Sequence, residues 1–210
     1  MIKPTKTIEK LAGGEPITIV ALGDSLTQGW MVSKGYIDFL EEMLRKGFPG
    51  SNFKLVNSGI PGDTADSGLH RMRWDVLHYD PDCVFIQYAL NDAFSGYSEL
   101  QFKDNIRGII EEIRKTGDAD IILITSGFIN DVNDNRLVEG FYRGLEQLGE
   151  RYGIPVALVH EYWKKKIKEG IPFESLVQYD YVHPTEAGYL LMAEAVMSLF
   201  EPDDKGDSAK

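Results

Sequence analysis

A serine lies on a glycine-flanked turn directly after a short apolar segment. That segment, residues 17–22, is rich in β-branched side chains, which predicts a buried strand. Gly23 and Gly29 bracket the turn, and glycine tolerates the backbone angles that a sharp turn requires. Ser25 would therefore present its hydroxyl at the end of a strand, where a ligand can reach it. A serine hydroxyl can attack a carbonyl carbon once a neighbouring base removes its proton.

The other groups that such a serine needs occur later in the chain. Asp180 and His183 are three residues apart, so one turn can bring carboxylate and imidazole together. Histidine changes charge near neutral pH, and aspartate can fix its tautomer by accepting a hydrogen bond from the second ring nitrogen. Donors for an oxyanion would be the backbone N–H groups at Ser25 and Gly62 and the side-chain amide of Asn91. Without these groups, the serine turn would be equally consistent with a polar turn that has no chemical role.

Two other patterns compete for a functional interpretation. His160 also follows a predicted strand and could act as the base, but no aspartate lies beside it at close spacing, so His183 is preferred. Residues 160–164 begin like a zinc-protease helix and lack its second histidine. Residues 131–135 resemble a calcium loop, but the required glycine and closing glutamate are replaced. No phosphate-binding loop or complete dinucleotide fingerprint occurs either, so we expect neither a metal nor a cofactor.

Alternating strands and helices must position these residues. Apolar or β-branched runs predict strands at 16–22, 53–57, 82–90, 121–125 and 154–159. Apolar residues at helical spacing predict helices over about 36–47, 65–79, 99–116, 134–148, 161–169 and 184–199. Residues 1–15 are expected to form a polar lead-in with one short helical turn, and residues 91–97 a loop.

The alternation predicts the fold class. A strand followed by a helix, repeated along the chain, implies a parallel sheet with helices on both faces. We therefore expect one α/β domain over residues 1–200, a three-layer α/β/α sandwich with a flavodoxin-like five-stranded parallel sheet in the order 2-1-3-4-5. Right-handed crossovers place the loops after the first three strands at one sheet edge, where such folds bind ligands. The charged segment 201–210 is expected to be a disordered tail.

Composition restricts the class of partner. The 22 Lys and Arg against 33 Asp and Glu give a net charge of −11, which argues against nucleic acid and anionic membranes as partners. The single cysteine, Cys83, excludes an internal disulfide. Neither a signal-peptide pattern nor a run of about 20 apolar residues is present, which predicts a cytoplasmic protein. The partner expected is a small-molecule ester, and the sequence makes no prediction about oligomeric state.

Four separated segments together resemble the SGNH hydrolase family, also called GDSL esterases and lipases. The segments are Gly23–Gly29, Asn57–Thr64, Ala89–Asp92 and Asp180–Pro184, and they follow the family's order. The resemblance implies a serine hydrolase that cleaves carboxylic esters through an acyl-enzyme. It implies Ser25, Asp180 and His183 as the catalytic triad. Gly62 and Asn91 would complete the oxyanion hole with the N–H of Ser25.

One residue departs from the family's pattern. The third segment usually begins with glycine, and here it begins with Ala89. We expect the extra methyl group to tighten the strand end near Asn91 without removing its hydrogen-bond donor. The departure therefore bears on substrate fit more than on activity.

The substrate class is expected to follow from the size of the loops. Five strand–helix units use almost the whole chain, which leaves no insertion for a lid or a deep acyl tunnel. The predicted substrate-binding residues form a hydrophobic rim: Trp30, Ile60, Phe94 and Tyr181. We expect a short-chain or carbohydrate O-acyl (acetyl) esterase. An acyl-thioesterase or lysophospholipase is the alternative, and a non-catalytic binding module is disfavoured because every catalytic position is filled.

Overall fold

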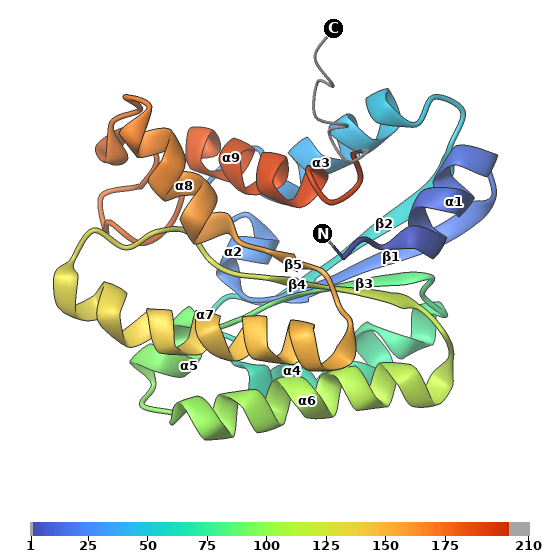
Figure 1. Cartoon of the computed structure of the whole chain (residues 1–210), viewed down its shortest axis with the longest axis horizontal. Coiled ribbons are helices and arrows are strands. Elements are labelled where there is room, and N and C mark those ends of the chain that lie inside the picture. Colours follow the sequence, from blue (N-terminus) through green and yellow to red (C-terminus); the bar gives the residue numbers. More distant parts are fainter. Residues whose placement is uncertain (1, 202–210) are drawn as a thin grey trace, which may run out of the picture.

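A five-stranded parallel sheet forms the centre of the computed structural model, which describes residues 2–201 (Figure 1). The strands are β1 (Pro16–Gly23), β2 (Asn52–Gly59), β3 (Cys83–Gln87), β4 (Asp120–Ile124) and β5 (Val156–Ala157). They pair in the order β2-β1-β3-β4-β5, each parallel to its neighbours. The predicted strand order and α/β/α class are therefore confirmed.

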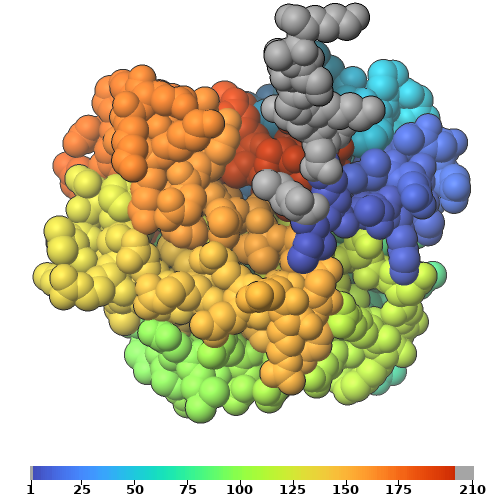
Figure 2. Space-filling model, in the orientation of Figure 1, coloured from blue at the N-terminus to red at the C-terminus, as the bar shows by residue number. Residues whose placement is uncertain are grey.

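Helices cover both faces of the sheet. One face carries α3 (Tyr36–Gly47), α8 (Val159–Lys168) and α9 (Glu186–Met197), and the other carries α4 (Ala65–Asp75), α6 (Glu99–Thr116) and α7 (Val132–Tyr152) (Figure 1). Shorter elements are α1 (Thr5–Gly13), α2 (Ser25–Gln28), α5 (Leu90–Phe94), η1 (Leu77–Tyr79) and η2 (Phe173–Ser175). Side chains fill the spaces between the ribbons (Figure 2). No helix within residues 2–201 has the length and apolarity needed to cross a lipid bilayer.

The core explains why these segments adopt these structures. All five residues of β3 are buried, as expected for a strand covered on both faces. α6 buries five apolar side chains that recur at helical spacing: Phe102, Ile106, Ile109, Ile110 and Ile113. A capping box at Ser98 begins that helix, as predicted. The Ser98 hydroxyl accepts a hydrogen bond from the backbone N–H of Gln101, and the Gln101 side chain accepts one from the backbone N–H of Ser98.

Strand register brings three loops to one level at the carboxyl edge of the sheet. Gly23, the last residue of β1, aligns with Gly59 in β2 and with Gln87 in β3. A side chain at position 59 would place its Cβ 2.3 Å from the backbone nitrogen of Gln28. Glycine at this position therefore lets the end of β2 approach α2 closely.

Two sequence predictions about strand ends were wrong for the same reason. β3 ends at Gln87 rather than at residue 90, and Leu90 with the first part of the predicted loop forms α5, with a helical hydrogen bond from Ala93 N to Ala89 O. β5 has only two residues, and Val159, predicted to end that strand, begins α8. Residues 83–90 are all buried, and residues 154–159 are buried or partly buried, through the change from strand to helix, so hydrophobicity alone could not locate the boundary.

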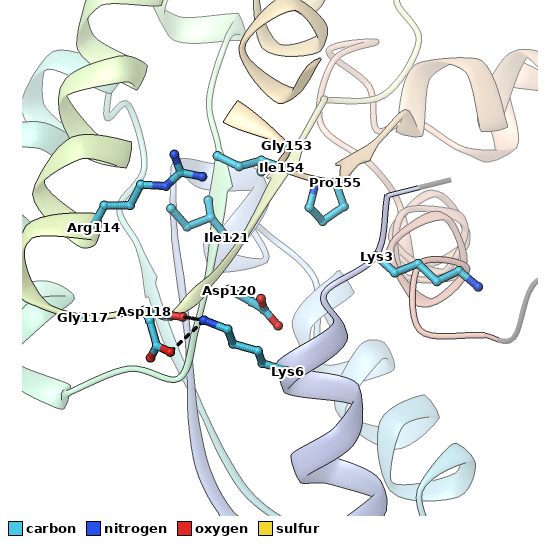
Figure 3. A pocket seen from close by; sticks show the side chains of 11 residues that line it. Lys3, Lys6, Arg114, Gly117, Asp118, Asp120, Ile121, Gly153, Ile154 and Pro155 are labelled. Carbon is cyan, nitrogen blue, oxygen red and sulfur yellow. Dashed lines mark hydrogen bonds and ion pairs between the residues drawn. The ribbon is translucent and has the colours of Figure 1, made fainter. Parts of the chain in front are cut away.

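The amino edge of the sheet is closed by α1. The lead-in predicted for this segment was wrong in extent, because a nine-residue helix forms. It is anchored where Asp120 accepts hydrogen bonds from the backbone and hydroxyl of Thr7. A cavity of about 390 Å³ lies at this edge, where Lys6 pairs with Asp118 (Figure 3). The segment 201–210, predicted to be a disordered tail, lies outside the described residues apart from Glu201.

Candidate active site

Ser25 lies where β1 passes into α2. Asp24 caps this short helix, because its carboxylate accepts a hydrogen bond from the backbone N–H of Leu26 at 2.8 Å. The serine is largely buried, yet its Oγ lies 3.0 Å from Nε2 of His183. Residues 158 positions apart in the sequence therefore meet at the carboxyl edge of the sheet, as predicted.

Asp180 holds His183 in one orientation. One carboxylate oxygen accepts hydrogen bonds from the backbone N–H groups of Val182 and His183, and the other lies 2.6 Å from the ring Nδ1. Because a carboxylate only accepts, Nδ1 carries the proton and Nε2 is free to accept the hydroxyl proton of Ser25. Partial burial favours a higher pKa for Asp180, but the hydrogen bonds from Val182 and His183 outweigh it, and the pKa lies below its usual value.

The predicted oxyanion residues lie on two loops that touch. Ile60 to Asp63 form a turn closed by a hydrogen bond from Asp63 N to Ile60 O at 3.1 Å. Gly62 is the third residue of the turn and has φ of +79°, which favours glycine. Nδ2 of Asn91 donates to the carbonyl of Asp63 at 2.8 Å. An amide nitrogen has two N–H groups, so this bond fixes the Asn91 side chain and leaves a second donor for a ligand.

Ala89 precedes this asparagine in a strained conformation. Its φ is +154° and its ψ is −44°, angles that a residue with a side chain rarely adopts. The residue is fully buried, so packing on all sides holds it in place. The alanine that stands where the family usually has glycine thus stores strain beside Asn91, of the order of 1–3 kcal/mol.

Two hydrogen-bonded groups of polar side chains, called here together the floor, lie beside the serine turn. Asp24 and Gln87 form one group, and Asp63, Arg71 and Tyr88 form the other; all are buried except Arg71, which is partly buried. Gln87 accepts a hydrogen bond from the Thr27 hydroxyl at 2.8 Å and donates to Asp24 and to Ser126. Tyr88 donates to the Asp63 carboxylate at 2.8 Å.

Burial changes the acidity of two carboxyl groups at this edge. Burial raises the pKa of Asp24 to about 7, although hydrogen bonds from Leu26 and Gln87 oppose the shift. Burial also raises the pKa of Asp92 to about 6, against a hydrogen bond from the backbone of Ala65. The pKa values of these two groups therefore lie close to neutral pH, where most carboxyl groups are fully ionised.

Four hydrophobic side chains, called here the rim, stand exposed on the loops and the short helix α5 that carry the site residues. Trp30, Ile60, Phe94 and Tyr181 have exposed fractions between 38% and 60%. The Trp30 ring centroid lies 6.2 Å from that of His183, which places this side chain beside the reacting groups. Three of the four predicted substrate-binding residues lie on loops, and Phe94 lies instead at the end of α5.

The competing histidine lies in a different environment. His160 is buried, its Nδ1 lies 2.9 Å from the Thr125 hydroxyl, and its ring stacks on Tyr142 at 4.5 Å. Burial lowers its pKa to about 4, so the ring is neutral near pH 7. Within residues 2–201, no three His, Cys, Asp or Glu side chains are grouped as a metal site would require. Asp131, in the segment that resembled a calcium loop, caps α7 instead.

Sequence reasoning overlooked the floor. Asp24 and Asp63 adjoin predicted site residues, so their acidic side chains offered a signal that was not used. Gln87 is a polar residue at the end of a buried strand, which is a second such signal. Arg71 gave none, because three of its partners, Gly23, Asp63 and Tyr88, lie on other segments of the chain.

Comparison with known proteins agrees with this geometry. The family model of the GDSL-like lipase/acylhydrolase family matches residues 21–191. Esterase TesA of Pseudomonas aeruginosa is 26% identical over 188 residues, covering 88% of each chain. Acetylxylan esterase of Geobacillus stearothermophilus is 24% identical over 212 residues, covering 90% of this chain and 94% of the relative. The crystal structure of acetylxylan esterase Axe2 from that organism has a TM-score of 0.80 at 21% identity, covering 89% and 95%.

Proposed function

Because this chain belongs to the GDSL-like lipase/acylhydrolase family and is a carboxylic ester hydrolase, we propose that Ser25, His183 and Asp180 are its catalytic triad. We propose further that its preferred substrates are short acyl esters, above all acetyl esters of carbohydrates. The observation that carries the triad is the continuous hydrogen-bonded path from the Asp180 carboxylate through the imidazole to the serine hydroxyl, with distances of 2.6 and 3.0 Å.

The first half-reaction transfers the acyl group to the enzyme. Ser25 Oγ attacks the ester carbonyl carbon while Nε2 of His183 takes its proton, and the carbonyl oxygen becomes an oxyanion. The amide of Asn91 and the backbone N–H groups of Gly62 and Ser25 would donate to that oxygen. When the tetrahedral intermediate collapses, the carbon–oxygen bond to the alcohol breaks. His183 returns its proton to the leaving alcohol, and Asp180 stabilises the imidazolium throughout.

The second half-reaction repeats the same steps with water. Nε2 of His183 accepts a proton from water as the water oxygen attacks the acyl carbon. The oxyanion that forms would accept hydrogen bonds from the same donors as before. Collapse breaks the bond to Ser25 Oγ, which regains its proton from His183. The products are a carboxylic acid and free enzyme, so one water is consumed for each ester bond that is cleaved.

The rim supports the proposed substrate class. Trp30 and Tyr181 present exposed aromatic surface near His183, and such surface can contact the apolar face of a sugar ring. A long acyl chain on such an exposed rim would leave most of its methylene groups in water, forgoing about 0.8 kcal/mol for each one left unburied. Among the relatives, one is named an acetylxylan esterase, which adds support for acetylated carbohydrates.

The experiment compares kcat/KM for p-nitrophenyl acetate, butyrate, octanoate and palmitate, and then for acetylated xylo-oligosaccharides. We expect acetate or butyrate to give the highest kcat/KM in the aryl ester series, and acetate release from the oligosaccharides. Values that keep rising to octanoate and beyond would instead favour an acyl-thioesterase or lysophospholipase. The set of substrates therefore also includes acyl-thioesters and lysophospholipids, which test these two alternatives directly.

A further inference from the structure

Arg71 contacts both the strand end that leads to Ser25 and the turn that holds the proposed oxyanion donors. It lies in α4 with its side chain 14% exposed. Its Nε donates to the Asp63 carboxylate at 2.8 Å, and one terminal nitrogen donates to the backbone carbonyl of Gly23 at 3.0 Å and to the Tyr88 hydroxyl at 3.1 Å. The other terminal nitrogen donates to Asp75 at 3.0 Å, on the more exposed side of the group.

Asp63 extends these contacts to the proposed oxyanion donors. It directly follows Gly62 in the turn, and its backbone carbonyl accepts the hydrogen bond from the Asn91 amide at 2.8 Å. Its carboxylate accepts hydrogen bonds from Arg71 and from Tyr88, each at 2.8 Å. The position of Asp63 therefore sets where both donors point, and Arg71 is one of the two groups that fix its side chain.

The contact with Gly23 adds the nucleophile to the same assembly. Gly23 ends β1 two residues before Ser25, and its carbonyl also accepts a hydrogen bond from the backbone N–H of Ile60 at 3.0 Å. Two donors, one from α4 and one from the oxyanion turn, thus converge on one carbonyl oxygen. Because a guanidinium is a planar fork with five N–H groups, Arg71 can reach this carbonyl and the Asp63 carboxylate at once.

We propose that Arg71 is a positioning residue, which holds the Ile60–Asp63 turn and its oxyanion donors at a fixed distance from the Ser25 nucleophile. The proposal rests on the proposed function, because it assigns Arg71 an effect on the transition state of that reaction. A shift of about 1 Å in catalytic groups can lower a rate by about 10²-fold. A loosened turn should therefore lower kcat while leaving ground-state substrate binding nearly unchanged.

The test replaces the planar guanidinium of Arg71 with a group that has the same charge but a different geometry. Arg71→Lys retains a cation that can pair with Asp63, but a single ammonium cannot also hold the Gly23 carbonyl in the same geometry. Asp75→Asn is the matched control, because it removes an ion pair from the same guanidinium on the side away from the oxyanion turn. Thermal unfolding of each variant, and titration of reactive serine with a fluorophosphonate, confirm folded protein and give kcat for each active site.

With p-nitrophenyl acetate, we expect Arg71→Lys to lower kcat by about 10²-fold with KM changed less than about threefold. Asp75→Asn should stay within about twofold of the parent. The decisive readout is a double-mutant cycle with Asn91→Ala, because a residue that acts through the oxyanion donors loses most of its effect once a donor is gone. We expect Arg71→Lys to cost less than about fivefold in that background.

Two results would overturn the proposal. One is an unchanged kcat in Arg71→Lys, and the other is an equal loss in both backgrounds, which would indicate a purely structural ion pair. If Arg71→Lys fails to fold, Tyr88→Phe takes its place, since it removes the hydroxyl that accepts a hydrogen bond from Arg71 and donates one to Asp63. The same non-additivity is required of it. A Ser25→Ala variant measured in parallel separates the two ideas, because full activity there would refute the proposed function rather than the role of Arg71.

Discussion

The floor and the rim of the active site are built in opposite ways. The floor residues are buried, except Arg71, whose side chain is 14% exposed, and they have several polar partners: Arg71 reaches four groups and Gln87 reaches three. Rim residues such as Tyr181 stand largely in solvent. Buried polar groups are costly unless they are paired, so the floor is fixed by many simultaneous hydrogen bonds. This fold therefore places the reacting atoms with one set of residues and contacts the substrate with another.

The separation leads to a rule that mutations can test. Changes at the reacting atoms and in the floor should act on kcat, because they alter interactions made in the transition state. Changes in the rim should act mainly on KM, since exposed side chains bind substrate and transition state about equally. A floor variant that changes mainly KM, or a rim variant that changes mainly kcat, would show that its residue has the role assigned here to the other set.

Loss of the nucleophile should have the largest effect. Ser25→Ala is expected to lower kcat by about 10⁴-fold or more, by analogy with other serine hydrolases. Fluorophosphonate labelling followed by peptide mapping should place the label on Ser25 in the parent, with no label in the variant. Ser175→Ala, an exposed serine in η2, serves as the control and should keep full activity and labelling. Label on another serine of the parent protein would refute the assignment.

Loss of an oxyanion donor should come next. Asn91→Ala is expected to lower kcat by about 10²- to 10³-fold, with a smaller change in KM, because the donor acts mainly on the transition state. Steady-state kinetics on p-nitrophenyl acetate measure both constants. An increase in KM alone would show that Asn91 binds the substrate and belongs functionally with the rim.

The buried carboxyl groups of this region should make stability depend on pH. In the unfolded chain, Asp24 ionises near its ordinary pKa of 3.8, whereas the folded protein holds its proton up to about pH 7. The folded state therefore binds more protons between these values, and the stability that the group contributes below pH 4 is lost as the pH rises towards 7. The loss is of the order of 4 kcal/mol, from a shift of about three pKa units.

Urea unfolding between pH 4 and pH 8 measures this dependence. Asp24→Asn should show a flatter curve, since the variant has no proton to lose at this position and its amide oxygen can still cap α2. Asp92, whose pKa is raised to about 6, adds a slope of the same sign. Parallel curves for the parent and the Asp24 variant would contradict the prediction.

A change in the rim should have the smallest effect. Trp30→Ala is expected to raise KM for an acetylated oligosaccharide by about 3- to 10-fold, as the loss of one aromatic contact of about 0.5–1.5 kcal/mol implies. The change in kcat should stay within about threefold. Trp74→Ala is the matched control, because this tryptophan is 66% exposed on α4 and is not a rim residue. A large loss of kcat in Trp30→Ala would instead show that its contact with His183 positions the base.

The sequence predicted the parts of this site that depend on local pattern. Alternating strand and helix signals were sufficient for the strand order, and the short spacing of Asp180 and His183 was sufficient for their hydrogen bond. The position of Ser25 followed from the glycine turn after a buried strand. The last two features depend on a few neighbouring residues, whereas the strand order follows from the alternation along the chain.

The parts that were missed depend on distant contacts. Arg71 looks like any other helical arginine until α4 packs against the ends of β1 and β3. The boundary of β3 was missed because Tyr88 and Leu90 are buried whether the chain is strand or helix. Strain at Ala89 is likewise visible only from its backbone angles, although the departure from the usual glycine marked the position.

The helix that closes the amino edge of the sheet determines how the enzyme could be mounted on a support. Bonds from α1 to Asp82 and Asp120 fix this helix at the edge opposite the serine turn. Lys6, whose side chain is half exposed, lies there too. A linkage to a bead or surface made through α1 would therefore leave the catalytic edge facing the surrounding liquid. On such a surface, polymeric substrates that are too large to diffuse into a porous carrier would still reach Ser25.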